Sequence, residues 1–324
     1  MRRCFLICDD RPAAEIGVRL AVASLRRYAS GEAVRVVFPP ADRRLRGWLG
    51  CEELTRIWPA PHGGWDVKPV AIHAALEEFE QVVWLDSDVI CAADPRPTLT
   101  ADASTLVVGE EPHNGTVAGG GRGRCLDWGW PVGRDLPAVN SGTLVAGRRH
   151  RPLLQAWASA LDDPRYRDNQ SRHRRDRDLG CVGDQDVLSA LLARERFAGV
   201  PVRLLRSGID VVQNLGAFGW HPRHRLRALA RGSPPLVHAL GPKPWDFADT
   251  LPHDAPPQVR HDAAVAEVSV YTQVARRLAD AAGLSAQQRR WMWPRTARGR
   301  LLRLAGLGVP ALLGLPLAAG RLLR

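Results

Sequence analysis

The most informative part of the sequence is the run Val82-Val83-Trp84-Leu85-Asp86-Ser87-Asp88-Val89-Ile90. Its first four residues are large and apolar, which predicts a short and fully buried strand. The two carboxylates that follow would lie where open α/β sheets bind ligands, outside the carboxyl ends of the strands. They need a counter-charge there, because unpaired buried charge is costly. A divalent cation that carries a phosphorylated substrate is one solution, and a solvated turn or a helix cap is the alternative.

The flanking sequence alternates between strand and helix patterns. We expect further strands over residues 4–8, 33–38, 106–109, 139–146, 200–205 and 235–239. Apolar residues at helical spacing predict helices over residues 13–28, 69–79, 152–161 and 186–197. This alternation is typical of a parallel, Rossmann-like α/β half. The glycine-rich segment 114–124 and the highly charged segment 165–178 lack such spacing and are expected to be loops.

Charge is distributed unevenly along the 324 residues. The composition is 45% hydrophobic and 24% charged, as in ordinary soluble proteins. The formal net charge is +11, yet no acidic residue follows Asp280, and the 44 residues after it hold eight arginines. A basic tail on a nearly neutral domain implies an anionic surface as its partner.

The cysteines and the N-terminus indicate a reducing compartment. The six cysteines include no Cys-x-x-Cys pair, so we expect small buried apolar side chains, with neither a zinc site nor a disulfide framework. The N-terminal apolar run of five residues ends at Asp9 and Asp10 and is too short for a secretory signal. We therefore expect the protein in the cytoplasm.

The character of the sequence changes at about residue 256. A helix is expected over residues 263–282, followed by Arg289-Arg290-Trp291-Met292-Trp293-Pro294. Residues 304–320 carry no charge, but glycine and proline interrupt them and they are at the short limit for a membrane-spanning helix. Tryptophan and arginine beside an apolar segment favour binding in the plane of a membrane. A spanning segment, or a helical hairpin packed on the domain, are the alternatives.

Three further segments place polar residues beside strands or helix starts. Val139-Asn140-Ser141-Gly142-Thr143-Leu144-Val145 begins a strand, and Gly183-Asp184-Gln185-Asp186 precedes a helix. Val237-His238-Ala239-Leu240-Gly241-Pro242-Lys243-Pro244-Trp245 runs from a strand into a loop. Each segment by itself also fits an ordinary structural role, namely a turn, a helix cap, a buried histidine or a surface lysine.

Together these segments resemble the family 8 glycosyltransferases. The matching motifs, in sequence order, are an Asp-x-Asp strand end, an Asn-x-Gly strand, an Asp-Gln helix start and a His-x-x-Gly loop followed by Lys-Pro-Trp. That family includes glycogenin, galactinol synthase and the bacterial transferases that build lipopolysaccharide outer cores. The resemblance covers about residues 1–250. It implies an α/β fold of the GT-A type, Rossmann-like, with a mixed central sheet flanked by helices. We therefore expect a glycosyltransferase domain over residues 1–255 and a basic, helical C-terminal extension over residues 256–324.

The resemblance also implies which residues bind the metal and the donor. Asp86, Asp88 and His238 match the ligands of a divalent metal, manganese or else magnesium, and two carboxylates with one imidazole suit manganese better than calcium. The metal would stabilise the charge on the leaving nucleoside diphosphate. Lys243 would contact the same phosphates, and Gly241 would allow close backbone approach. The donor-binding set that the resemblance implies is Asp9, Lys68, Asp86, Ser87, Asn140, Ser141, Asp184, Gln185, Gly241 and Lys243.

Asp184 and Gln185 are the catalytic residues that the resemblance implies. Asp184 would accept hydrogen bonds from hydroxyls of the donor sugar, and Gln185 would lie near the anomeric carbon. The family retains the anomeric configuration. An amide is a poor nucleophile, so we favour a front-face mechanism in which the leaving phosphate assists deprotonation of the acceptor. The chain departs from the family before Lys243, where Pro242 alone stands in place of two residues.

These features together predict a retaining, metal-dependent glycosyltransferase. It would move a hexose from a UDP-sugar to a glycan or glycolipid acceptor of the lipopolysaccharide kind. Its basic tail would bind an anionic membrane surface and hold the enzyme at the inner face of the cell membrane.

Other functions are weaker alternatives. A sugar-phosphate nucleotidyltransferase is disfavoured because Cys-Asp-Asp-Arg-Pro replaces the usual Gly-x-Gly-Thr-Arg loop, and a non-catalytic nucleotide-sugar-binding membrane protein is another possibility. A nucleic-acid partner is disfavoured because the basic residues gather in an apolar tail. Tyr166 would be the acceptor in any self-glycosylation. Trp128 and Trp130 would either stack on an acceptor sugar or pack their loop onto the core.

Overall fold

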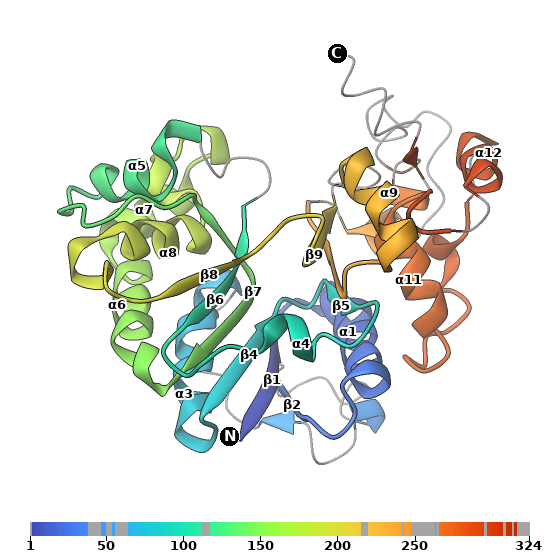
Figure 1. The fold of residues 1–324 in the computed structure, drawn as a ribbon, viewed down its shortest axis with the longest axis horizontal. Coiled ribbons are helices and arrows are strands. Elements are labelled where there is room, and N and C mark those ends of the chain that lie inside the picture. Colours follow the sequence, from blue (N-terminus) through green and yellow to red (C-terminus); the bar gives the residue numbers. More distant parts are fainter. Residues whose placement is uncertain are drawn as a thin grey trace. The chain divides into compact units, whose positions relative to one another are not determined.

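The structure is a computed structural model (Figure 1). The residues that it describes are 2–37, 47–49, 54–55, 64–111, 117–214, 220–241, 243–247, 263, 266–294, 297–306, 309–312 and 314–315. The chain forms two compact units, each built from several segments. Unit 1 comprises Met1–Asp10, Glu32–Asp86 and Leu99–Leu205, and unit 2 comprises Arg11–Gly31, Ser87–Thr98 and Arg206–Arg324.

Unit 1 contains a seven-stranded mixed sheet in the order β3-β2-β1-β4-β7-β6-β8. β1 lies parallel to β2 and to β4, β2 parallel to β3, and β6 parallel to β8, whereas β7 runs antiparallel to both β4 and β6. This confirms the mixed central sheet that the resemblance implies. The parallel arrangement expected from the alternation of strands and helices was wrong for β7. The strands are β1 (Arg3–Cys8), β2 (Ala33–Val37), β3 (Leu54–Thr55), β4 (Gln81–Leu85), β6 (Leu106–Glu110), β7 (Val139–Gly147) and β8 (Val202–Leu205).

Helices of unit 1 cover this sheet and bury its apolar side chains. The core joins Trp84 of β4 and Leu144 of β7 to Ile72 of α3, Trp157 of α6 and Leu188 of α8. These three helices carry their apolar residues on the side that faces the sheet, as the helical spacing predicts. The helices are α3 (Val67–Glu78), α4 (Arg96–Leu99), which crosses the boundary between the units, α5 (Gly120–Asp127), α6 (Arg151–Leu161), α7 (Pro164–Ser171) and α8 (Asp184–Ala193).

Unit 2 contains a separate three-stranded sheet in the order β5-β10-β9. The sequence run that starts at Val82 therefore contributes strands to two sheets, because β4 ends at Leu85 and β5 begins at Val89. β10 pairs antiparallel with β5 and parallel with β9. The elements are α1 (Glu15–Tyr28), β5 (Val89–Cys91), β9 (Val211–Asn214), α9 (Pro222–Arg231), β10 (Leu236–Ala239), α11 (Val270–Leu278) and α12 (Ala297–Ala305).

Two predicted loops were wrong. Residues 165–178 include most of α7, whose start is capped by the Asp163 side chain, and a short 3-10 helix over Arg174–Asp176. The segment folds because Tyr166 and Asn169 are buried under its charged residues. In the glycine-rich segment, the described residues 117–124 form a 3-10 turn and the start of α5. Glycine permits this, since Gly119 and Gly120 both have positive φ.

The described part of the chain shows the state of five cysteines and the length of the helices. Cys4, Cys8, Cys91, Cys125 and Cys181 are buried and free, and burial raises the pKa of Cys4 and Cys91 to about 12. Cys51 lies outside the described residues. Among the residues that the structure describes, no helix is both long and apolar enough to cross a membrane. Eight of the seventeen residues of segment 304–320 lie outside them. The helix expected over 263–282 is α11 in its central part.

Candidate active site

The Asp86 carboxylate lies directly after β4 and is held by two donors of unit 1. Its backbone N–H donates to Gly142 O at 2.8 Å, which ties the strand end to β7. Trp84 Nε1 donates to Asp86 Oδ1 at 2.8 Å, because residues two apart on a strand lie on the same face. Lys68 Nζ lies 3.1 Å from the same oxygen. Asp86 is therefore a charge-paired carboxylate at the carboxyl end of the central sheet.

Lys68 is a buried cation that joins two of the predicted segments. Its Nζ lies 3.1 Å from Asp184 Oδ2 and donates to Ser141 Oγ at 2.8 Å. Burial lowers the pKa of Lys68, but the charges of Asp184 and Asp86 together outweigh burial, so its pKa stands above the ordinary value. The ammonium consequently stays charged at neutral pH and neutralises two carboxylates.

The start of α8 and the start of β7 form one hydrogen-bond network. Ser141 Oγ donates to Asp184 Oδ2 at 2.7 Å. Asn140 Nδ2 donates to Gln185 Oε1 at 3.1 Å, and Gln185 Nε2 donates to Glu111 Oε2 at 3.0 Å. The Gln185 amide is thus fixed in one orientation, with a donor on its oxygen and an acceptor on its nitrogen.

Glu111 is a residue of this network that the sequence analysis missed. It follows β6 (Leu106–Glu110) directly and is buried, and its Oε2 also lies 3.5 Å from Asn140 Nδ2. The available signal was its position, since Glu110 and Glu111 end a strand just as Asp86 does. The pattern gave no means to tell which of the two glutamates faces the site.

A second buried ion pair supports the first turn of α8. Arg124 Nε donates to Asp186 Oδ1 at 2.6 Å, and both side chains are buried. Arg124 Nη1 also donates to Gly120 O at 2.9 Å within α5. Burial raises the pKa of Asp186, and the opposing charge of Arg124 limits the rise. Asp186 therefore anchors α8 on α5, while its neighbours Asp184 and Gln185 are engaged by β7 and Glu111.

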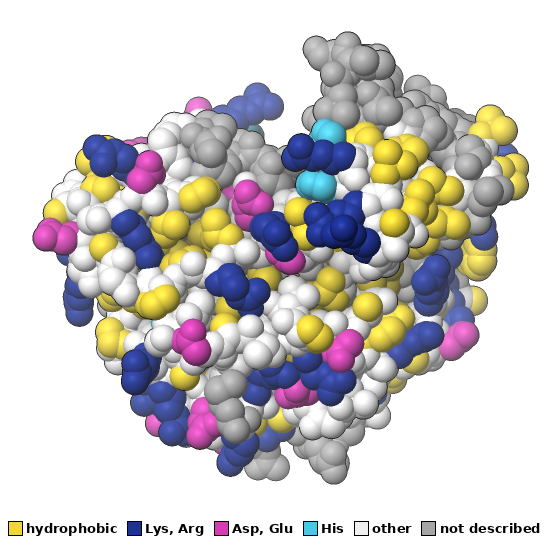
Figure 2. Space-filling view, in the orientation of Figure 1, with side chains coloured by type: hydrophobic (Ala, Val, Ile, Leu, Met, Phe, Trp, Pro, Cys, Tyr) yellow, Lys and Arg dark blue, Asp and Glu magenta, His cyan; other side chains and the backbone are white. Residues whose placement is uncertain are grey.

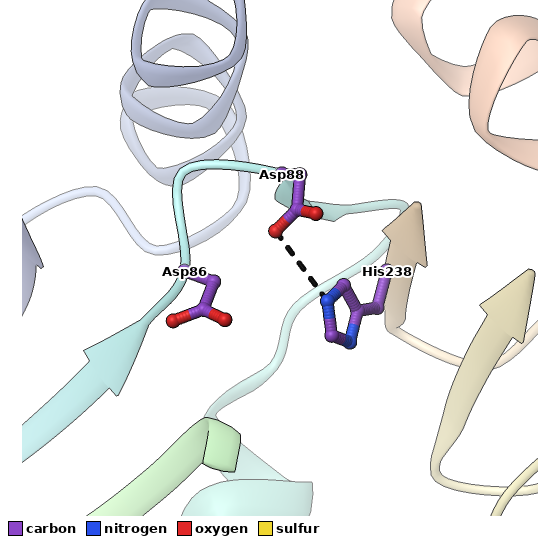
Figure 3. A group of neighbouring side chains, drawn as sticks. All are labelled: Asp86, Asp88 and His238. Carbon is purple, nitrogen blue, oxygen red and sulfur yellow. Dashed lines mark ion pairs between the residues drawn. The ribbon is translucent and has the colours of Figure 1, made fainter. Parts of the chain in front are cut away.

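In unit 2, the buried side chains of Asp88 and His238 form a group with the half-buried Lys243. His238 Nε2 lies 3.4 Å from Asp88 Oδ1, and Lys243 Nζ forms an ion pair with Asp88 Oδ2 (Figure 3 shows Asp88 and His238). The positions follow from the sheet, because His238 of β10 pairs with Val89 of β5 and Ala239 N donates to Asp88 O. Burial raises the pKa of Asp88, but Lys243 and His238 outweigh it and hold the pKa well below its usual range.

Figure 3 also draws Asp86, which precedes Asp88 by two residues on the same chain. The Cα atoms of residues that are two apart can separate by no more than about 7 Å, so Ser87 alone spaces the two carboxylates. Asp86, Asp88 and His238 offer carboxylate oxygens and an imidazole nitrogen, a set that could hold a metal ion. Two hard oxygen donors with one imidazole fit manganese or magnesium.

The loop around Ser87 is closely packed within unit 2. A Cβ atom on Gly17 of α1 would lie 2.4 Å from Ser87 O and 2.9 Å from the Trp245 ring. Trp245 in turn lies against Tyr271 and Trp291, with ring centroids 5.9 and 6.0 Å away. The Lys-Pro-Trp loop and the Asp-x-Asp loop therefore rest on α1 and on C-terminal residues. Gly241, with φ of +73°, has the left-handed backbone that favours glycine.

Asp9 lies at the end of β1 in unit 1. Its backbone N–H donates to Val37 O at 3.2 Å, and its side chain is buried. Because β1 pairs with β4, the end of β1 lies beside the strand end that carries Asp86. The predicted contact with a uracil base remains a prediction.

The aromatic candidates for an acceptor or an acceptor contact all interact with other residues of unit 1. Tyr166 is 1% exposed and donates to Asp66 Oδ1 at 3.0 Å, which disfavours self-glycosylation at the residue that was its candidate acceptor. Trp128 and Trp130 stack on each other with centroids 4.7 Å apart, and Trp128 Nε1 donates to Gly180 O. This pair packs its loop onto unit 1, which was the second of the two alternatives.

Unit 1 thus brings together six of the predicted residues in two groups that adjoin in sequence. One group is Lys68, Asp86, Ser141 and Asp184, and the other is Asn140 with Gln185. Unit 2 brings together Asp88, His238 and Lys243. Both are short-range polar networks with buried charges, the kind of environment in which catalytic groups are held.

No protein-family model matches the sequence. A search of curated proteins likewise finds no match. Among solved structures, the chain is similar to galactosyltransferase LgtC in complex with donor and acceptor sugar analogs, with 17% identity over 85% of this chain and 95% of that one and a TM-score of 0.47. It is also similar to glycosyltransferase GlyE of Streptococcus pneumoniae TIGR4, with 14% identity, coverage of 85% and 63%, and a TM-score of 0.48. A third is the bifunctional glycosyltransferase WbbM, with 13% identity, coverage of 74% and 46%, and a TM-score of 0.47. The chain therefore spans about half the length of WbbM and under two thirds of GlyE.

Proposed function

We propose that the protein is a retaining, metal-dependent glycosyltransferase of the GT-A type that moves a hexose from a UDP-sugar. The observation that carries this proposal is the network around Lys68, which joins Asp86 of the Asp-x-Asp segment to Asp184 of the Asp-Gln segment. These two segments, which carry motifs of the family resemblance, lie nearly a hundred residues apart in sequence. The buried ammonium of Lys68 forms an ion pair with an aspartate of each. A purely structural turn and a purely structural helix cap would not need a shared buried counter-charge.

In this proposal Asp86, Asp88 and His238 hold a divalent metal, manganese in first place. When bound, the metal stabilises negative charge on the leaving nucleoside diphosphate. Asp88 is suited to the role because its pKa is held well below the usual range, so it is an anionic donor at neutral pH. Lys243, already paired with Asp88, adds positive charge beside the same diphosphate.

The remaining residues bind and orient the donor sugar. Asp184 forms an ion pair with Lys68, and its carboxylate oxygens can accept hydrogen bonds from sugar hydroxyls. Gln185 presents an amide that Asn140 and Glu111 fix, which suits it to steady developing charge near the anomeric carbon rather than to attack it. Retention then follows from a front-face reaction, in which a leaving phosphate oxygen accepts the acceptor's proton.

For the acceptor we propose a glycan or a glycolipid of the lipopolysaccharide kind, reached at the inner face of the cell membrane. The supporting feature is the C-terminal extension, where Trp293 is exposed and the guanidinium groups of Arg276 and Arg303 both lie over its ring. Leu301 and Leu304 of α12 are exposed as well. Exposed tryptophan and leucine among arginines suit the interface of an anionic bilayer.

The test is a UDP-release assay with UDP-glucose, UDP-galactose and their N-acetyl forms, with and without manganese. We expect turnover with one of them that depends on the metal and is lost in Asp88→Ala. Asp94→Ala is the matched control, because Asp94 lies on the same segment but is exposed and paired with Arg96. Turnover that survives Asp88→Ala would overturn the metal assignment. Saturable binding of a UDP-sugar without any release of UDP would support the non-catalytic alternative instead.

A further inference from the structure

Helix α9 carries an exposed apolar strip that neither the site nor the C-terminal extension accounts for. α9 lies between β9 and β10 of unit 2, and its side chains Leu226 and Leu229 are 57% and 47% exposed. Figure 2 shows yellow and dark blue side chains gathered over the region where Figure 1 places α9. Of the seven large hydrophobic side chains that are exposed in the described part of the chain, six belong to unit 2 between residues 226 and 309.

Arginines line one side of this strip. Arg223, Arg227 and Arg231 are spaced by four residues and therefore form a row along the helix. Leu226 lies beside this row, three residues after Arg223, and Leu229 lies one turn beyond Leu226. All three are exposed. The long aliphatic part of arginine can lie along apolar surface while its guanidinium remains in a polar layer. We call these five residues the basic-apolar face of α9.

The charges of this face have no acidic counterpart nearby in sequence. α9 contains no aspartate or glutamate, and none of the three arginines forms an ion pair with a carboxylate of the described residues. Like charges four residues apart on a helix repel each other. An anionic surface would relieve the repulsion between these arginines, whereas a neutral partner would not.

The orientation of α9 is fixed from its buried side. Arg225 is fully buried, and its Nε donates to Trp220 O at 2.8 Å and its Nη1 to Ala311 O at 3.4 Å. Its guanidinium also lies over the Trp220 ring, 5.2 Å from the centroid. Together with buried Ala228, these contacts keep the opposite face of α9 turned outward. The basic-apolar face therefore lies on the surface of unit 2.

We propose that the basic-apolar face of α9 is a docking surface for an anionic lipid bilayer, with α9 lying in the plane of the membrane. Leu226 and Leu229 would enter the boundary between headgroups and acyl chains, and the arginine row would contact lipid phosphates. A nucleic acid would also attract the arginines, but it offers no apolar medium for two exposed leucines on the same face. The proposal concerns a segment outside the C-terminal extension and does not depend on the chemistry of the active site.

The test is co-sedimentation of the full chain with vesicles of phosphatidylcholine alone or mixed with phosphatidylglycerol. We expect binding only to the mixed vesicles, and a loss of about tenfold or more in Leu226→Gln/Leu229→Gln and in Arg223→Gln/Arg227→Gln/Arg231→Gln. Leu126→Gln is the matched control, because Leu126 is 54% exposed on α5 of unit 1. Leu301→Gln/Leu304→Gln measures the share of the C-terminal extension separately, and thermal unfolding of each variant checks that it folds.

Three results would overturn the proposal. The first is vesicle binding by both α9 variants at the level of the wild type. The second is equal binding of the wild type to both kinds of vesicle. The third is unchanged vesicle binding together with lost binding to a single-stranded oligonucleotide, which would assign α9 to nucleic acid. UDP release in solution tests the proposed transferase independently, so failure of one proposal is distinguishable from failure of the other.

Discussion

Lys68 Nζ lies 3.1 Å from Asp184 Oδ2, and both side chains are buried. The lysine enters from α3 and the aspartate from the first turn of α8, so the contact joins two helices at the end of the central sheet. Since Lys68 also pairs with Asp86, one cation serves two anions. Removing that cation would leave two carboxylates without their counter-charge.

We therefore expect Lys68→Met to lower both stability and activity. Breaking a buried ion pair by removing one partner typically costs about 3–5 kcal/mol. Chemical denaturation would show that loss. UDP release would fall to background because Asp184 and Asp86 lose their shared counter-charge. Lys68→Met/Asp184→Asn should recover part of the stability but none of the turnover. Equal stability of the single and double variants would contradict the role of Lys68 as a shared counter-charge.

Gly17→Ala tests the packing behind the Asp-x-Asp loop. In an exposed helix this change stabilises by about 1 kcal/mol, but here the new Cβ would lie 2.4 Å from the Ser87 carbonyl oxygen. Overpacking costs about 1–3 kcal/mol, and a backbone oxygen cannot rotate away, so the clash should outweigh the helix preference. We expect a lower melting temperature and weaker manganese binding by calorimetry.

The matched control for this substitution is Gly199→Ala, where nothing lies within 4 Å of the added Cβ. It should leave metal binding as in the wild type. A Gly17→Ala protein that is more stable than the wild type and binds manganese equally well would show that α1 does not brace the loop.

Glu111→Gln tests whether the orientation of the Gln185 amide matters for turnover. The substitution keeps the shape of the side chain but removes the charge that accepts from Gln185 Nε2 at 3.0 Å. Misplacement of a catalytic group by about 1 Å can cost up to about 100-fold in rate. We expect kcat to fall by about 10- to 100-fold while KM for the donor changes much less. Glu110→Gln, one residue earlier, is the control, and a fall confined to KM would assign Glu111 to donor binding instead.

The sequence predicted the fold well where periodicity was strong. The buried run before Asp86 and the strand that starts at Val139 lie beside each other in the sheet, and the helix after Gly183 follows its apolar spacing. The antiparallel direction of β7 was not predicted, because strand patterns carry no direction and the family resemblance implied only a mixed sheet. The charged segment containing Tyr166 failed, because one buried tyrosine outweighed a dozen polar neighbours that suggested a loop.

The candidate site was predicted in its residues but not in its contacts. Lys68, Ser141 and Asp184 were expected as separate donor contacts, whereas the structure joins them directly to one another. Lys243 was expected to face phosphates, and it pairs with Asp88. Contacts between distant segments depend on the direction and burial of their side chains, and the spacing of residues in one sequence does not determine these. Glu111 and Arg124 were not predicted as part of the site for the same reason.

His150 gives the fold a dependence on pH that is separate from the site. The residue is buried after β7; its Nδ1 accepts from Gly147 N at 2.9 Å, so its proton is on Nε2, 3.0 Å from Ser104 O. Burial lowers the pKa of His150 below its ordinary value of 6.5. Below pH 6.5 the unfolded chain therefore binds a proton that the folded chain resists. Its contribution to stability is complete above that pH and declines as the pH falls toward the lower folded pKa.

We expect the free energy of unfolding of the wild type to fall between about pH 7.5 and about pH 5.5, in the range where histidine titrates. His150→Gln should be less stable at the upper pH, because it loses the paired contacts to Gly147 and Ser104, yet its stability should change less across the range. His173→Gln, at an exposed histidine, should follow the wild-type curve. Urea denaturation at both pH values measures each slope. Parallel curves for the wild type and His150→Gln would show that His150 does not carry this pH dependence.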